Sequence, residues 1–201
     1  PNAAQSKAIA ALKSWNLVNS PESVGATIFE NWVLTLQNCL WDDEFSADEK
    51  VPMNRPSMDR TIQMIKSEPT ARWWDDTKTS AKESMSDIIM KSLQANVDTL
   101  LKQHGPQGPE WAWYKHKQTG VRHLIPGMDA LSRLNIPIGG GGTIVNAATT
   151  KTGQSWRLVV ELSKEGKPRA YGVYPGGQSG NPGSSHYDDL IDTWAKGELK
   201  P

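Results

Sequence analysis

One segment near the C-terminal end concentrates residues whose types could support chemistry. It is the stretch YPGGQSGNPGSSHYDD, residues 174–189. His186, Asp188 and Asp189 could act as acid–base groups or as metal ligands. Just ahead of a helix, however, an aspartate has a simpler role, because it caps the first turn and offsets the positive end of the helix dipole. We expect Asp188 and Asp189 to cap the helix predicted by YDDLIDTWAKGEL.

Ser179 could be a nucleophile, but its surroundings do not fit that role. A nucleophile elbow reads G-x-S-x-G and opens a helix beneath the serine. Here Gly180 follows Ser179 directly, and Pro182 and Gly183 come next, which predicts no helix. The terminal amine of Pro1 could serve as a base, although we expect Pro1 to mark only a boundary within a longer protein. The residues alone therefore contain no complete catalytic set.

The remaining candidates for metal or phosphate binding are also incomplete. Histidines occur at positions 104, 116, 123 and 186, with no H-E-x-x-H pair and no second cysteine to complete a zinc site. The tetraglycine run at 139–142 lacks the Gly-Lys-Ser/Thr ending of a phosphate loop, and it leads into TIVNAA, which predicts a strand. We expect this chain to hold neither a metal ion nor a cofactor.

Composition narrows the function classes further. The chain has 201 residues, with 22 basic and 22 acidic side chains and a net charge of zero, which argues against a nucleic-acid partner. It has no apolar run of the length that spans a membrane. Nine tryptophans predict a tryptophan-rich core or a large interface, in preference to a carbohydrate-stacking role. The single cysteine, Cys39, cannot form an intramolecular disulfide and is predicted to be a small buried hydrophobe.

The first half of the sequence reads as helical. We predict helices in AAQSKAIAALKSW, in 20–41 with Ser20 as N-cap and Pro21 at the first position, in SMDRTIQMIKS, and in 80–104. Ser80 and Glu83 match a capping box, and His104-Gly105-Pro106 is a stop signal. Between the last two helices, a loop is expected to bury both Trp73 and Trp74.

The second half predicts strands. GPQGPEWAWYKHKQTGVRHL is read as a hairpin, and SWRLVVEL and RAYGVYP as two strands joined through SKEGKP. The fold class is therefore α+β, with a helical segment at 1–108 and a β-rich segment at 109–201 that ends in a short helix. Antiparallel pairing is expected, because the connections are too short for parallel crossovers.

Several of these stretches together resemble the C-terminal end of the penicillin acylase family of N-terminal nucleophile hydrolases. The resemblance is carried by TIVNAA, GQSWR, GGQSGNPGS, HYDD and WAKGE, in that order. Upstream, ALKSWN and ESVGATIFENW are similar to family helices, with Asn16 where aspartate is usual. The resemblance implies that this chain is part of the family's αββα architecture, near the end of the large subunit.

The resemblance also implies a mechanism that this chain does not carry. Family members cut themselves and expose an N-terminal serine, which attacks a linear amide with its own α-amine as base. That serine sits in a Gly-Ser-Asn junction, which is absent here, and the oxyanion asparagine and the calcium ligands are expected upstream as well. No catalytic residue is assigned to this chain. The signature is interpreted as structural, and its residues are Trp156, Arg157, Gly176, Gly177, Gln178, Ser179, Gly180, Asn181, His186, Asp188 and Asp189.

Further expectations follow from the same resemblance. The partner would be the rest of the precursor, the substrates would be acyl side chains of β-lactam antibiotics or acyl-homoserine lactones, and the location would be periplasmic or secreted. We expect Arg157 to be paired with Asp188 or Asp189, because charges are rarely buried alone. The alternative is a non-catalytic binding module derived from the family. A segment of a larger enzyme should expose an apolar face or an unpaired strand edge.

Overall fold

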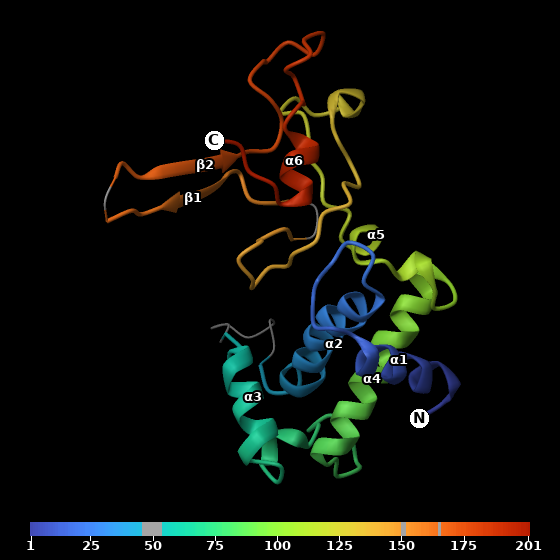
Figure 1. The fold of residues 1–201 in the computed structure, drawn as a ribbon. Helices are drawn as coiled ribbons and strands as arrows, with labels where there is room; N and C mark the ends of the chain where they lie inside the picture. The colour runs from blue at the N-terminus through green and yellow to red at the C-terminus, as the bar shows by residue number, and fades with distance from the viewer. Residues whose placement is uncertain (46–53, 150–151, 165) are drawn as a thin grey trace. The chain divides into compact units, whose positions relative to one another are not determined.

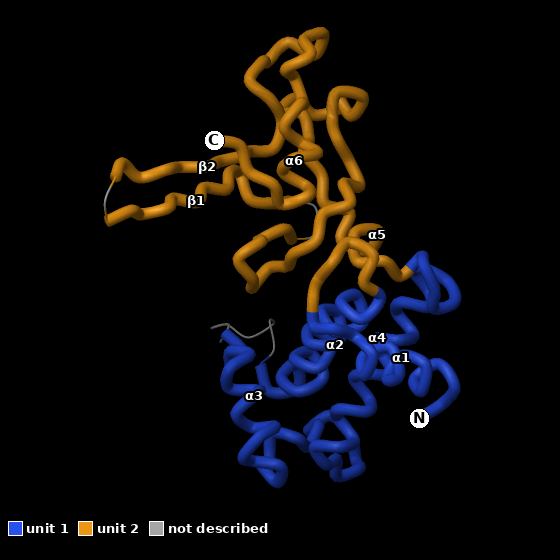
Figure 2. Tube along the Cα trace, viewed as in Figure 1, with its two compact units in different colours: residues 1–17, 24–110 blue, residues 18–23, 111–201 orange. Residues whose placement is uncertain are grey.

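The computed structural model describes residues 1–45, 54–149, 152–164 and 166–201 (Figure 1). The chain forms two compact units (Figure 2). Unit 1 contains residues 1–17 and 24–110, and unit 2 contains residues 18–23 and 111–201. Unit 1 is helical, and unit 2 combines a pair of strands with short helices and long loops, so the chain is a mixed α+β protein.

The described residues of unit 1 form four α-helices. They are α1 (Ala3–Ser14), α2 (Val24–Trp41), α3 (Met58–Ser67) and α4 (Met85–His104), with a short 3-10 helix η1 (Arg72–Trp74) before α4. The helix expected to begin at Pro21 begins at Val24 instead. The Pro21 carbonyl accepts a hydrogen bond from the Tyr114 N–H of unit 2 (2.8 Å), so the residues before Val24 serve as a loop of that unit.

The start of α4 differs from the predicted capping box. Ser84 is the N-cap, and it exchanges hydrogen bonds with Asp87 in a capping box of its own. Glu83 is not available for this role, because its carboxylate accepts from the Asp76 N–H (3.2 Å) and the Thr79 hydroxyl (2.7 Å). The predicted stop is confirmed, since Gly105 ends the helix with φ at 73°, in the region that favours glycine.

Two tryptophans lie at the centre of a hydrophobic core cluster in unit 1. Trp41 and Trp74 are fully buried and pack with apolar residues of α2, α3 and α4. Their indole N–H groups donate to the Thr61 hydroxyl and to the Glu68 carbonyl, at 3.1 Å and 2.9 Å. Trp73 is only half-buried, so the prediction that both members of the pair are buried is wrong for Trp73. It lies against Phe45 and beneath the Arg72 guanidinium instead.

Unit 2 holds the predicted strand pair. β1 (Arg157–Glu161) and β2 (Arg169–Val173) are antiparallel, with Arg157 opposite Val173 and Glu161 opposite Arg169. Helix α6 (Ile191–Lys196) follows the signature segment. Trp194 of α6 is fully buried in a cluster with Ile136, Ile138, Ala148, Val173, Leu190 and Ile191.

Two predictions of further strands are wrong. The stretch read as a hairpin contains the 3-10 helix η2 (Pro109–Trp111) and helix α5 (Trp113–Lys117), because Trp111, Trp113 and Lys117 turn inward together. TIVNAA forms turns rather than a strand, with Ile144 and Val145 exposed. A third 3-10 helix, η3 (Asp129–Leu131), lies in the loop between α5 and this region. Among the described residues, no helix is both long and apolar enough to cross a membrane.

Candidate functional site

The signature segment folds into a loop whose two ends are joined by backbone hydrogen bonds. The Leu190 N–H donates to the Gly176 carbonyl (2.9 Å), and the Ser179 N–H donates to the His186 carbonyl (3.0 Å). Gly176 has φ at 109°, which L side chains rarely adopt. At Gly177 a Cβ atom would lie 2.0 Å from the His186 carbonyl oxygen, so only glycine fits at this closure point.

Inside the loop, polar side chains bind the loop's own backbone. The Ser179 hydroxyl accepts from the Asn181 N–H (3.1 Å), the Asn181 side chain accepts from the Gly183 N–H (3.0 Å), and the Ser184 hydroxyl accepts from the His186 N–H (3.1 Å). Gln178 donates to the Tyr174 hydroxyl. These are the contacts by which Asx and serine turns fix a chain.

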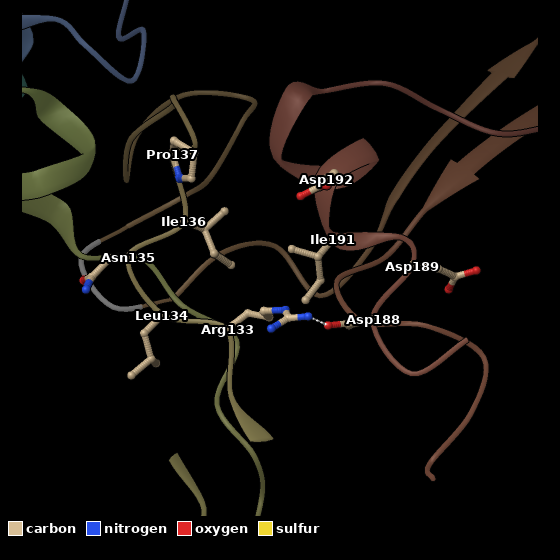
Figure 3. Close-up of a pocket in the computed structure, with 9 residues that line it drawn as sticks. All are labelled: Arg133, Leu134, Asn135, Ile136, Pro137, Asp188, Asp189, Ile191 and Asp192. Carbon is tan, nitrogen blue, oxygen red and sulfur yellow. Dashed lines mark ion pairs between the residues drawn. The ribbon is translucent and has the colours of Figure 1, made fainter. Parts of the chain in front are cut away.

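Asp188 faces a pocket beside this loop (Figure 3). Its carboxylate forms an ion pair with Arg133, and the pocket has a volume of about 360 Å³. Asp189 and Asp192 also line the pocket, with Ile136 and Ile191 on its apolar side. The Arg133–Asp188 pair therefore ties the signature segment to the loop that follows η3.

Asp189 bonds to His186 instead of capping the helix. Its Oδ2 lies 3.0 Å from His186 Nδ1, and this hydrogen bond lowers the pKa of the Asp189 carboxyl. Helix α6 has Leu190 at its N-cap with no side-chain cap bond, so the expected capping by Asp188 or Asp189 is wrong. The physical reason is competition, because both carboxylates already have a cationic or hydrogen-bonding partner within the loop region.

Arg157 is held by neutral groups rather than by a carboxylate. Its Nη2 donates to the Asn146 side-chain oxygen (2.8 Å) and its Nη1 to the Trp194 carbonyl (3.3 Å). The expected pairing with Asp188 or Asp189 is therefore wrong. Because desolvation is not matched by a nearby carboxylate, burial lowers the pKa of the Arg157 guanidinium. Arg157 links β1, α6 and the turn that contains Asn146.

The burial of Lys117 is a structural feature of unit 2 that sequence reasoning missed. Its side chain is fully buried, and its ammonium group donates to the carbonyls of Gly139 (2.8 Å) and Ala148 (3.1 Å). Trp113 adds an indole N–H bond to the Gly140 carbonyl (2.6 Å). A lysine within WYKHK gives no sequence signal for burial, because its acceptors lie more than twenty positions away.

The tetraglycine run therefore supplies backbone carbonyls as hydrogen-bond acceptors, and it does not form a phosphate-binding loop. Its carbonyls face Lys117 and Trp113, while the Gly140 N–H donates to the Asn19 carbonyl (2.8 Å). At Gly139 a Cβ atom would lie 2.5 Å from that same carbonyl oxygen, which explains the need for glycine. Within the described ranges, no cluster of three or more acidic, histidine or cysteine side chains could hold a metal ion.

The arrangement brings together groups that fix the loops of unit 2. His186, Asp188 and Asp189 lie close in sequence and each contacts a protein partner, while Ser179 bonds to the loop backbone. The Tyr187 hydroxyl donates to the Leu131 carbonyl (2.9 Å), which adds another tie across the same region. Each of these contacts joins a residue of the signature segment to the backbone or to a side chain of unit 2, and so holds the loops in place.

Comparison with known proteins gives one matching family model and several similar acylases. The family model described as penicillin amidase matches residues 1–201. Acyl-homoserine lactone acylase QuiP of Pseudomonas putida is 26% identical over 207 residues, which cover 95% of this chain and 25% of the relative. The QuiP proteins of Pseudomonas fluorescens Pf0-1 and Pseudomonas aeruginosa are 30% and 32% identical, over 98% and 62% of this chain. The chain spans about a quarter or less of the length of these relatives.

Proposed function

The chain belongs to the penicillin amidase family, and from that premise we propose that it is a structural segment of an amidohydrolase that cleaves linear amides. In this proposal the nucleophile is an N-terminal serine located elsewhere in the same protein. The signature residues of this chain serve to build and hold the loops of unit 2. The single observation that carries the proposal is a difference in coverage. The family model matches all 201 residues of this chain, whereas the chain aligns with only about a quarter of the length of its QuiP relatives.

The geometry of the signature supports a structural role for its residues. Gly176 and Gly177 meet backbone constraints, and Asp188 and Asp189 are bound to Arg133 and His186. A nucleophile needs an adjacent base that is itself oriented. The hydroxyl of Ser179 instead accepts from the Asn181 N–H, in a turn that the loop requires.

Acyl-homoserine lactones are the first substrates to test for the whole protein. The curated relatives that match this chain carry the name acyl-homoserine lactone acylase. Acyl side chains of β-lactams are the second substrate class, because they present the same linear amide bond. The whole protein is proposed to be periplasmic or secreted, in keeping with the family.

The reading frame of the gene tests the proposal. We expect the frame to continue upstream of the Pro1 codon and to contain a Gly-Ser-Asn junction and an export signal. N-terminal sequencing of the mature large subunit should then return serine. A frame that starts immediately before Pro1, with no such junction, would overturn the proposal and favour a free-standing binding module.

A further inference from the structure

The buried ammonium group of Lys117 lies among three backbone carbonyls. Its Nζ is 2.8 Å from the Gly139 carbonyl oxygen, 3.1 Å from that of Ala148 and 3.5 Å from that of Gly140. The same nitrogen lies 5.4 Å from the centroid of the Trp113 ring. Backbone carbonyls that converge on one point can replace the hydration shell of a cation, and the face of an aromatic ring attracts the same charge. We call the three carbonyls and the ring the ammonium site.

The ammonium site lies where a turn of the chain closes. Gly139 and Gly140 stand at the beginning of the segment 140–148, and Ala148 stands at its end. The carbonyls of both ends accept hydrogen bonds from the one ammonium group of Lys117. A single side chain, which comes from α5, therefore joins the two ends of this turn.

The closed turn holds Asn146, which is the partner of a signature residue. The Asn146 side-chain oxygen accepts from Arg157 Nη2 (2.8 Å) and from Gln154 Nε2 (2.8 Å). Its backbone carbonyl accepts from the N–H groups of Gly141 (3.1 Å) and Ala148 (2.7 Å), inside the same turn. Whatever closes the turn therefore also places the acceptor of the Arg157 guanidinium.

The charge and the donors of Lys117 match what this site requires. A buried ammonium group is costly unless its protons are hydrogen-bonded. An ammonium group has three N–H donors, and three carbonyls surround this one. Removal of the group would leave buried carbonyls without these donors, which is more costly than loss of the bonds alone.

We propose that the segment 139–148 and the Trp113 ring form a binding site for a primary ammonium group, which Lys117 fills as a tethered ligand. Lys117→Ala removes three methylene groups and the ammonium nitrogen, which together have the outline of propylammonium. A free propylammonium ion is therefore expected to enter the site of that variant and to close the turn. All of these groups belong to unit 2, so the site does not depend on the proposed function.

Two substitutions of Lys117 test whether the charge is needed. Lys117→Met keeps most of the apolar stem without the ammonium group, whereas Lys117→Ala removes both. Both variants should lower the Tm of the full chain by at least about 5 °C, measured by circular dichroism. Lys196→Ala, at an exposed lysine of α6, is the matched control and should change the Tm by less than about 2 °C. A Lys117→Met chain that melts within about 2 °C of the parent would overturn the proposal.

Chemical rescue tests the site itself. Propylammonium chloride, added up to about 0.2 M, should raise the Tm of Lys117→Ala by about 3–5 °C relative to the same concentration of sodium chloride. The uncharged 1-propanol and tetramethylammonium, which has no N–H donor, should not do so, and Lys117→Met should not respond to propylammonium. If Lys117→Ala is unfolded in buffer, the same titration is read as recovery of the folded circular dichroism signal. Absence of rescue, or equal rescue by 1-propanol or tetramethylammonium, would overturn the proposal.

Amide hydrogen exchange shows whether the ammonium group closes the turn. The N–H groups of Gly141 and Ala148 are the reporters, because both donate to the Asn146 carbonyl. In Lys117→Ala they should exchange at least about tenfold faster than in the parent chain, and propylammonium should restore the slower rates. Unchanged exchange at both positions in Lys117→Ala would overturn the closure of the turn by the ammonium group.

Discussion

At the scale of single residues, Gly177 marks the point where the signature loop closes. A methyl group there would meet the His186 carbonyl oxygen and carbon at 2.0 Å and 2.7 Å. We therefore expect Gly177→Ala to destabilise the chain by about 1–3 kcal/mol, the usual cost of overpacking. Urea unfolding followed by circular dichroism measures this difference in the free energy of unfolding.

Gly180 in the same loop is the matched control. A Cβ atom at Gly180 meets nothing within 4 Å, and its φ lies outside the region that L side chains avoid. Gly180→Ala should change stability by less than about 0.5 kcal/mol. Equal losses for Gly177→Ala and Gly180→Ala would contradict the steric account of the loop.

Arg157 should couple energetically to Asn146 and not to Asp188. Its guanidinium donates to the Asn146 side chain at 2.8 Å, while Asp188 is bound to Arg133. A double-mutant cycle with Arg157→Ala and Asn146→Ala should give a coupling free energy of about 1 kcal/mol. The same cycle with Asp188→Ala should give less than about 0.5 kcal/mol. A larger coupling free energy with Asp188 than with Asn146 would contradict the structure and support the carboxylate partner expected from the sequence.

The features of the signature that sequence reasoning could address are those with local causes. The closing glycines and the failure of Ser179 to form an elbow follow from neighbouring residues alone. The partner of Arg157 could not be found in this way, because we expected its guanidinium to form an ion pair with a carboxylate. Asn146 lies eleven positions away, and only the fold brings its amide oxygen to the guanidinium.

At the scale of elements, helix α4 offers a direct test of its first turn. Ser84 accepts from the Asp87 N–H and so holds the capping box, whereas Ser80 was the cap expected from the sequence. Ser84→Ala should destabilise the chain by about 0.5–2 kcal/mol. Ser80→Ala should change the free energy of unfolding by less than about 0.5 kcal/mol. A larger loss of stability for Ser80→Ala than for Ser84→Ala would indicate that Ser80 is the N-cap, as the sequence pattern predicted.

The same cap predicts a dependence on pH. The Ser84 hydroxyl and N–H hydrogen bonds hold the pKa of the Asp87 carboxyl below its ordinary value of 3.8. A carboxyl whose pKa is lowered by folding stabilises the protein above its ordinary pKa, and this contribution is lost as the pH falls through the folded value. The stability difference between the parent chain and Ser84→Ala should therefore shrink below pH 3.8. A difference that grows on acidification would contradict the assignment.

The helices of unit 1 were predictable because their signals repeat along the chain. Leu93, Val97 and Leu100 lie on the predicted stripe of α4 and are buried. Ser92 and Asn96 are buried beside them, which the apolar pattern could not indicate. Their partners are Trp32 and the Ile28 carbonyl, at 2.9 Å and 3.0 Å, and both lie on α2 far away in sequence.

The strands of unit 2 were only partly predictable for a related reason. β1 and β2 have alternating side chains and a short connection, so local pattern was sufficient. The stretch from residue 105 to 124 has the aromatic content of a hairpin, but Lys117 and Trp113 bind the glycine carbonyls about 25 positions away. Those long-range contacts favour a short helix over strand pairing.

At the scale of the whole molecule, the main observation is the share of its relatives that this chain covers. The family match spans the chain, and the chain spans about a quarter of its relatives. This coverage is what the proposed function expects of a chain that forms one part of a longer protein.

Hydrolysis of N-acyl-homoserine lactones tests this account most directly. The whole protein, its variant with the N-terminal serine of the large subunit replaced by alanine, and this 201-residue chain alone are assayed side by side for release of homoserine lactone. The account predicts release by the whole protein only, with activity unaffected by Ser179→Ala beyond any loss of stability. Hydrolysis by the chain alone would contradict it.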